Sequence, residues 1–162
     1  MRPGFLRCAA RLMVLGCALP SLRATPAAAQ TQGAQEQLWD AAIQGDTVAM
    51  AAALQRGALI DSLDERRSPN GRRALNWAAW YNHPVAILFL AARGATVSMA
   101  NWTGFTPLHH AAENGCLEAT RALLALGADR SRLNAMGQRP VDVARERGHP
   151  DVAALLDSLP PN

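Results

Sequence analysis

Residues 101–134, NWTGFTPLHHAAENGCLEATRALLALGADRSRLN, contain the pattern of one complete structural unit. The stretch consists of a turn, a short helix, a second helix and a Gly-Ala-Asp exit. The segments on both sides repeat it with a period of 33 residues. Residues of one type that recur at this spacing are Gly71, Gly104 and Gly137; Ala78, Ala111 and Ala144; and Gly94 and Gly127. A constant period of about 20–50 residues predicts an array of stacked repeats.

The repeat pattern divides most of the 162-residue chain into units. We expect a short polar linker at residues 30–35 and a C-terminal tail at residues 160–162. Between them the pattern predicts one domain, residues 36–159, with units at about 36–62, 70–100, 101–133 and 134–159. A single helix pair cannot bury its apolar face alone, so stacking of the units must supply the core.

One connection between units is longer than the others. Gly57 and Gly94 lie 37 residues apart, four more than the period. The extra residues fall in a segment that we call the long loop, residues 63–73 (LDERRSPNGRR). Pro69-Asn70-Gly71 within it is a strong turn signal.

These residues resemble the ankyrin repeat, whose pattern is G-x-T-P-L-H-x-A-A followed by a turn and a second helix that ends L-L-x-x-G-A-D. The matching residues of the third unit are Gly104, Thr106, Pro107, Leu108, His109, Ala111, Ala112, Gly115, Leu123, Leu124, Gly127, Ala128 and Asp129. The resemblance implies an all-α ankyrin repeat solenoid of about four helix-turn-helix repeats, joined by short hairpin-like loops. It says little about function, which must be argued from a site.

The first 29 residues have the features of a cleaved secretory signal peptide. A short apolar segment, residues 12–22, precedes Ala27-Ala28-Ala29, a small-residue cleavage site. The positive region before it contains Arg2, Arg7 and Arg11. We therefore expect a periplasmic or secreted protein that is cleaved near Ala29. Lipid attachment at Cys17 is the alternative.

The charge of the chain changes once the signal peptide is set aside. All 16 basic residues are arginines, and four of them lie in the first 29 residues, which leaves 12 arginines against 13 acidic residues. A formal charge near −1 argues against general attraction to nucleic acid. Because the chain has no run of about 18 apolar residues, we expect no stable membrane span.

The chain offers few residues for catalysis or metal binding. His110 and Glu113 lie three residues apart on one helical face and supply two ligands, whereas a zinc site needs three or four. Cys116, the one cysteine after the signal peptide, stands where the ankyrin family usually has histidine, a structural position. We expect no cofactor and no metal. A small metal- or thiol-dependent enzyme that uses His110, Glu113 and Cys116 is the weaker alternative.

The second unit carries the sharpest functional signal. Trp77, Trp80 and Tyr81 follow the i, i+3, i+4 spacing and share one helical face. The equivalent residues in the other units are mainly polar: Asp40, Ile43 and Gln44; His110, Glu113 and Asn114; Val143, Glu146 and Arg147. In ankyrin proteins these positions line the concave groove. Exposed rigid aromatics of this kind are typical of interface hot spots.

Two interpretations of the aromatic stripe stay open. The stripe is a binding surface, extended by Trp102 and Phe105 of the next loop. Alternatively, the long loop folds onto it and its arginines stack on the indole rings. Both hold if the loop acts as a lid.

The sequence therefore predicts a non-enzymatic protein-protein interaction module. It is expected to bind its partner through aromatic and arginine side chains on the concave face. The residues expected to bind the partner are Trp77, Trp80, Tyr81, Trp102, Phe105, His110, Glu113, Asn114, Arg66, Arg67 and Arg72. We expect a monomer that acts in the periplasm. A self-assembling structural protein, joined through Cys116 or the aromatic stripe, is the alternative.

Overall fold

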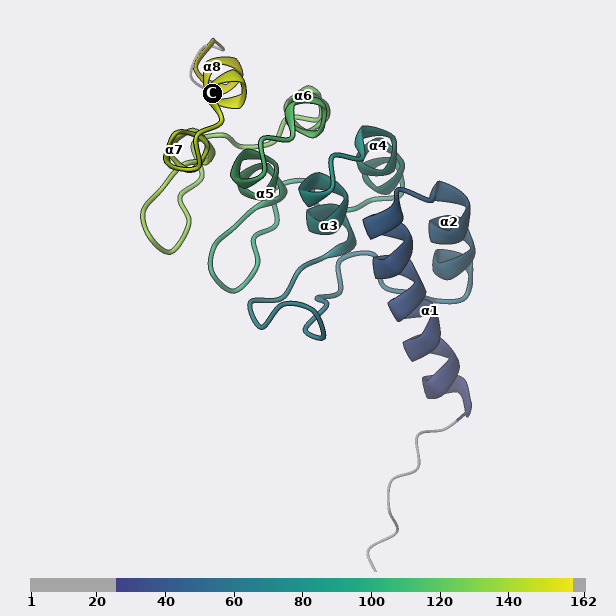
Figure 1. The fold of residues 1–162 in the computed structure, drawn as a ribbon. Coiled ribbons are helices and arrows are strands. Elements are labelled where there is room, and N and C mark those ends of the chain that lie inside the picture. The colour runs from purple at the N-terminus through teal and green to yellow at the C-terminus, as the bar shows by residue number, and fades with distance from the viewer. Residues whose placement is uncertain (1–25, 159–162) are drawn as a thin grey trace, which may run out of the picture.

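The computed structural model describes residues 26–158, which form four antiparallel helix pairs (Figure 1). The helices are α1 (Pro26–Gln44), α2 (Thr47–Gln55), α3 (Ala74–Trp80), α4 (Pro84–Ala92), α5 (Pro107–Glu113), α6 (Leu117–Ala125), α7 (Pro140–Glu146) and α8 (Pro150–Ser158). The expected all-α repeat solenoid is confirmed. None of these helices combines the length and apolarity that a membrane crossing requires.

The helices form two layers, and each helix packs on its counterpart in the next pair. Helices α1, α3, α5 and α7 make the inner layer, and α2, α4, α6 and α8 make the outer layer. We call the surface of the inner helices that faces away from the outer layer the inner face. The loops before α3, α5 and α7 project to one side of the stack (Figure 1).

The core consists of columns of apolar side chains at the repeat period. One column runs through the inner layer with Leu75, Leu108 and Val141, and another through the outer layer with Leu90, Leu123 and Leu156; all six are at most 5% exposed. Leu38 begins the inner column in α1 and is fully buried. Each helix pair thus buries an apolar face that it cannot cover by itself.

The start of each later inner helix is fastened by its third residue. The side chain of that residue accepts a hydrogen bond from the backbone N–H of the residue just before the helix, which would otherwise lack a partner. The acceptors are Asn76, which binds Arg73 N at 3.0 Å, His109, which binds Thr106 N at 3.2 Å, and Asp142, which binds Arg139 N at 3.0 Å. Three chemically different residues therefore perform one task at 33-residue spacing.

A second repeated contact joins neighbouring pairs. The residue just before α4, α6 and α8 binds a backbone carbonyl near the end of the inner helix of the preceding pair. These contacts are His83 Nε2 to Ile43 O at 2.9 Å, Cys116 Sγ to Trp80 O at 3.3 Å and His149 Nε2 to Glu113 O at 3.2 Å. Cys116 is a free thiol, 6% exposed, and takes the place of histidine in the series.

The size of the residue opposite this contact matches the size of the side chain that makes it. Gly45 and Gly115 have positive φ, and a Cβ at either would lie 2.8 Å or 2.5 Å from the imidazole of the next pair. The equivalent position holds Asn82, with φ of 57°, opposite the smaller Cys116. Its amide oxygen accepts a hydrogen bond from Ala119 N at 2.9 Å and so caps α6 from the preceding unit.

The loop tips are stacked by backbone hydrogen bonds. Trp102 N donates to Asn70 O at 3.2 Å, and Ala135 N donates to Thr103 O at 2.9 Å. Gly104, with φ of 77°, permits this close approach, since a Cβ would lie 2.8 Å from Ala135 N. The tips therefore form a continuous edge.

The structure corrects the predicted linker. Residues 30–35 are part of α1, and Ala34 and Gln35 within them are buried. Gln35 holds this part of α1 against the first connection, because its side-chain amide donates to Leu59 O and accepts from Leu59 N. The predicted tail, Cys17 and most of the predicted signal peptide lie outside the described residues.

The pairing of Asn82 with Cys116 can be tested by a double-mutant cycle. Cys116→His should destabilise the fold because the imidazole meets the Asn82 Cβ, whereas Asn82→Gly with Cys116→His should recover stability. We expect the free energy of unfolding of the double variant, measured with urea, to exceed the sum expected from the two single substitutions by about 1–2 kcal/mol. Additivity within about 0.5 kcal/mol would show that the two positions do not interact.

Candidate functional site

The inner face is not uniformly exposed. Each inner helix contributes the three positions that the sequence predicted to line the groove. After the first unit, the first position is buried (Trp77, His110, Val143), and the third is exposed (Tyr81, Asn114, Arg147). Trp77 is 3% and His110 2% exposed, so neither forms part of the open surface. This differs from the predicted stripe of three exposed aromatics.

The long loop covers the aromatic residues of α3. Asp64 and Arg72 pair as an antiparallel bridge, and Gly71 N donates to Ser68 O in the turn between them. The turn brings the Arg72 guanidinium 3.9 Å from the Trp80 ring centroid and 4.6 Å from that of Trp77. The interpretation in which loop arginines stack on the indoles is therefore correct for Arg72, while Tyr81 stays 47% exposed.

His110 lies in a pocket of aromatic rings. Its imidazole is 5.6 Å from the Trp80 ring and 5.4 Å from the Phe105 ring, measured between centroids. Neither ring nitrogen has a hydrogen-bond partner, and Nδ1 is 3.6 Å from Glu113 Oε2. Burial lowers the pKa of His110 from 6.5 to about 4, so the imidazole is neutral near pH 7.

Glu113 is the acidic group next to His110. It forms an ion pair at 2.9 Å with Arg147, the residue that follows α7. The contact to the His110 imidazole is the largest of the effects that lower the pKa of Glu113, and the charges of Arg147 and Arg72 act in the same direction. Glu113 is therefore ionised and shared between two units.

A small polar cavity opens between the long loop, the next loop tip and α5. Its volume is about 100 Å³. The residues that line it are Ser68, Asn70, Arg72, Asn101, Thr103, Phe105, His110 and Glu113. Four of the eleven residues predicted to bind a partner line the cavity: Arg72, Phe105, His110 and Glu113. Trp80 and Trp77 pack against the Arg72 guanidinium.

The other predicted aromatic residues lie at the surface. Trp102, at the loop tip, is 60% exposed. Tyr81 stacks on Trp77 with ring centroids 6.2 Å apart and presents its other face outward. Met136, at the tip of the following loop, is 68% exposed and was not singled out from the sequence. Large apolar side chains are thus presented at two successive tips.

The remaining loop arginines are bound within the chain. Arg66 pairs with Glu36 at 3.3 Å and with the buried Asp64 at 3.0 Å, and Arg67 pairs with Asp40 at 2.9 Å. These contacts fasten the long loop to α1. A partner that uses Arg66 or Arg67 must therefore compete with acidic residues of α1.

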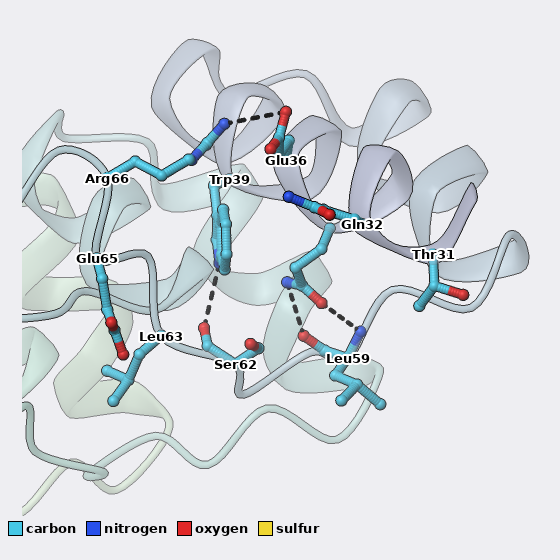
Figure 2. Close-up of a pocket in the computed structure, with 10 residues that line it drawn as sticks. Thr31, Gln32, Glu36, Trp39, Leu59, Ser62, Leu63, Glu65 and Arg66 are labelled. Atoms are coloured by element: carbon cyan, nitrogen blue, oxygen red, sulfur yellow. Dashed lines mark hydrogen bonds and ion pairs between the residues drawn. The ribbon is translucent and has the colours of Figure 1, made fainter. Parts of the chain in front are cut away.

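A second pocket, of about 580 Å³, lies between α1 and residues 59–66 (Figure 2). Trp39 stands at its centre, donates from its indole N–H to Ser62 O at 3.1 Å and is covered by Arg66 at 4.9 Å. Leu59 and Leu63 form an apolar wall. Sequence reasoning missed this pocket because residues 30–35 were assigned to a linker, although Trp39 is an aromatic residue on the same helix.

The structure places the residues of the alternative enzyme in separate roles. Burial raises the pKa of the Cys116 thiol, which disfavours the nucleophilic thiolate. Within residues 26–158, no group of three or more His, Cys, Asp or Glu side chains is arranged to hold a metal ion.

Comparison with known proteins finds one repeat family. A family model described as "Ankyrin repeats (3 copies)" matches residues 87–159. Human cyclin-dependent kinase 4 inhibitor B is 35% identical over 125 residues, which cover 76% of this chain and 87% of the inhibitor.

Longer proteins match over shorter segments. An ankyrin repeat domain-containing protein from Stachybotrys chartarum is 35% identical over 97 residues, 60% of this chain and 5% of that protein. Protein phosphatase 1 regulatory subunit 12A from Mus musculus is 34% identical over 96 residues, 59% of this chain and 9% of the subunit. The chain thus spans a small part of these two relatives.

The buried His110 should make stability depend on pH. The folded state binds its proton with a pKa of about 4 and the unfolded state near 6.5, so the unfolded chain holds more protons between these values. Stability should fall as the pH drops from about 6.5 to 4, by about 3 kcal/mol from this group.

The measurement is urea unfolding of the wild type and of His110→Gln between pH 7.5 and 4.5. Burial also lowers the pKa of His109, so both proteins should lose stability, but the variant should lose less. Equal losses would contradict the assignment to His110.

Proposed function

The chain belongs to the ankyrin repeat family, and from this premise we propose that it is a non-enzymatic module that binds another protein through its inner face and loop tips. The observation that carries the proposal is the exposure of rigid aromatic side chains beside a polar cavity: Tyr81 and Trp102 are 47% and 60% exposed. Large aromatics at a surface are the residues that dominate binding energy at interfaces.

The framework behind these residues supports a binding role. Tyr81 rests on the buried Trp77, and the Trp102 backbone is bonded to Asn70 of the long loop. Because both side chains stand on ordered supports, less entropy is lost when a partner immobilises them. Three other residues predicted to bind the partner are half-buried and add apolar and charged surface: Trp80, Phe105 and Glu113.

The names of two relatives support a role in protein binding. One is named as an inhibitor of a cyclin-dependent kinase and another as a regulatory subunit of a protein phosphatase. Both names describe proteins that act on another protein. We propose the same general mode for this chain, with a different and unspecified partner.

We further propose that the protein acts in the periplasm as a monomer. The proposal rests on the predicted signal peptide and on α1, in which Ala34, beyond the predicted cleavage site, is buried. Residues 30–33 are exposed, so cleavage after Ala29 leaves the buried contacts of α1 from Ala34 onward in place. The one thiol in the repeat units, Cys116, is buried and does not favour covalent self-assembly.

The binding surface is tested with Tyr81→Ala and Trp102→Ala, alone and together. Each removes an exposed aromatic without opening the core, and the double variant should weaken binding of a partner captured from periplasmic extract by at least about tenfold. The control is Leu88→Ala, which removes a 48% exposed apolar side chain from α4 in the outer layer and should leave affinity within about twofold. Titration calorimetry measures both. Unchanged affinity in a folded double variant would refute this surface.

The proposed compartment is tested by expression of the full chain in a Gram-negative host. N-terminal sequencing of the protein from the periplasmic fraction should give Gln30 as the first residue. An uncleaved chain in the cytoplasmic fraction would exclude export, and a lipid-modified Cys17 at the N-terminus would support the lipoprotein alternative.

A further inference from the structure

We propose that the polar cavity between the long loop, residues 101–105 and α5 binds a carboxylate group, with Arg72 as its anchor. Where the carboxylate belongs to an acidic side chain of a partner protein, the inference rests on the proposed function. Where it belongs to a free small acid, the inference stands without it. Three features of the cavity support the proposal: its charge balance, its polar groups without hydrogen bonds and its size.

Arg72 is a cation without an anionic partner of its own. Its guanidinium packs on two indole rings, and its Nε is buried without a hydrogen-bond partner. Within residues 26–158 the guanidinium forms no ion pair, in contrast to Arg66, Arg67 and Arg147. The indole rings hold the guanidinium in one plane, which favours bidentate recognition of a carboxylate.

The charges around the cavity leave one positive charge to balance. Glu113 is the acidic residue in its lining, and its carboxylate is already paired with Arg147. The two arginines and one glutamate sum to a single positive charge, since His110 is neutral near pH 7. One monovalent anion brings the sum to zero, whereas a dianion such as sulfate would leave a net negative charge beside Glu113.

His110 supplies a second buried polar group whose ring nitrogens form no hydrogen bond. It is 2% exposed and lines the cavity. Neither ring nitrogen has a partner at hydrogen-bond distance, and Nδ1 faces Glu113 Oε2 at 3.6 Å. A neutral imidazole always has one N–H donor. A buried polar group without a partner costs about 1–3 kcal/mol, so a ligand that satisfies it gains affinity.

The size of the cavity selects a small group. A water molecule needs about 10–15 Å³ of such space, so 100 Å³ accommodates a carboxylate with one or two attached carbons. Of the lining residues, Ser68 and Asn101 are buried and Asn70 is exposed. A carboxylate that enters the cavity meets Arg72, because Arg72 is one of the lining residues.

The test is a titration of the full mature chain with sodium acetate at pH 7, with sodium chloride added to keep the ionic strength constant. Nitrogen-15 NMR follows the Nε–H signals of Arg72, Trp77 and Trp80. We expect saturable shifts at these signals and no saturation with sulfate. The proposal would be overturned if acetate caused no saturable shifts, or if sulfate or chloride bound as tightly as acetate.

Three variants assign the site. Arg72→Gln should weaken acetate binding by at least about tenfold, because a hydrogen bond to a charged group is lost. Arg93→Gln is the matched control: Arg93 stacks on Phe89 at 4.6 Å, and its removal should leave acetate affinity unchanged. Glu113→Gln removes the negative charge and should strengthen binding about threefold or more. If Arg72→Gln does not fold by circular dichroism, Glu113→Gln decides, and unchanged or weaker binding there overturns the proposal.

The source of the carboxylate is distinguished by a second pair of probes. N-acetylated, C-amidated aspartate and glutamate carry a side-chain carboxylate within a peptide frame. Tighter binding of these than of acetate indicates a protein source, and tighter binding of acetate indicates a free acid. The outcome is separable from the proposed function: a failed partner interface leaves the acetate shifts intact, whereas failure here is their absence in a chain that still binds its partner.

Discussion

Every part of this structure depends on the contact that joins one helix pair to the next. The contact has an apolar component, the columns of leucine and valine at 33-residue spacing. It also has a polar component, in which His83, Cys116 and His149 each bind a carbonyl of the preceding unit. The apolar columns supply most of the stabilisation, whereas the side-chain-to-carbonyl bonds fix the register, because a hydrogen bond tolerates little displacement.

The same contact between helix pairs explains why equivalent positions of the units hold different residues. Asn82 stands where Gly45 and Gly115 stand in the neighbouring units, and the smaller Cys116 opposite it leaves room for a Cβ. Asn76 and Asp142 take the capping role that His109 performs in the most regular unit. The array therefore conserves contacts and spacing between its units while it varies the chemistry that makes them.

The one place where the period fails is also where the candidate site forms. Four additional residues cannot enter the stacked helices without breaking the columns, so they extend the long loop. Arg66 fastens that loop to α1, and Arg73 donates hydrogen bonds to Asp61 O in the preceding connection and to Ala100 O just before the next loop tip. Once held, the loop brings Arg72 over two indole rings and encloses the polar cavity against residues 101–105.

Sequence alone determined the repeat fold, the helix pairs, the long loop and the structural role of Cys116, because these follow from local capping and from a period that every unit shares. It also located the aromatic residues on one face of α3. Only the tertiary structure decided which of them are open: Trp77 and His110 are buried, and Tyr81 and Trp102 are exposed. It also placed Trp39 and Gln35 in a pocket beside residues assigned to a linker. The physical reason is that a loop outside the period carries no spacing rule. Where it lies, what it covers and which charge it leaves unpaired depend on contacts between residues far apart in the chain.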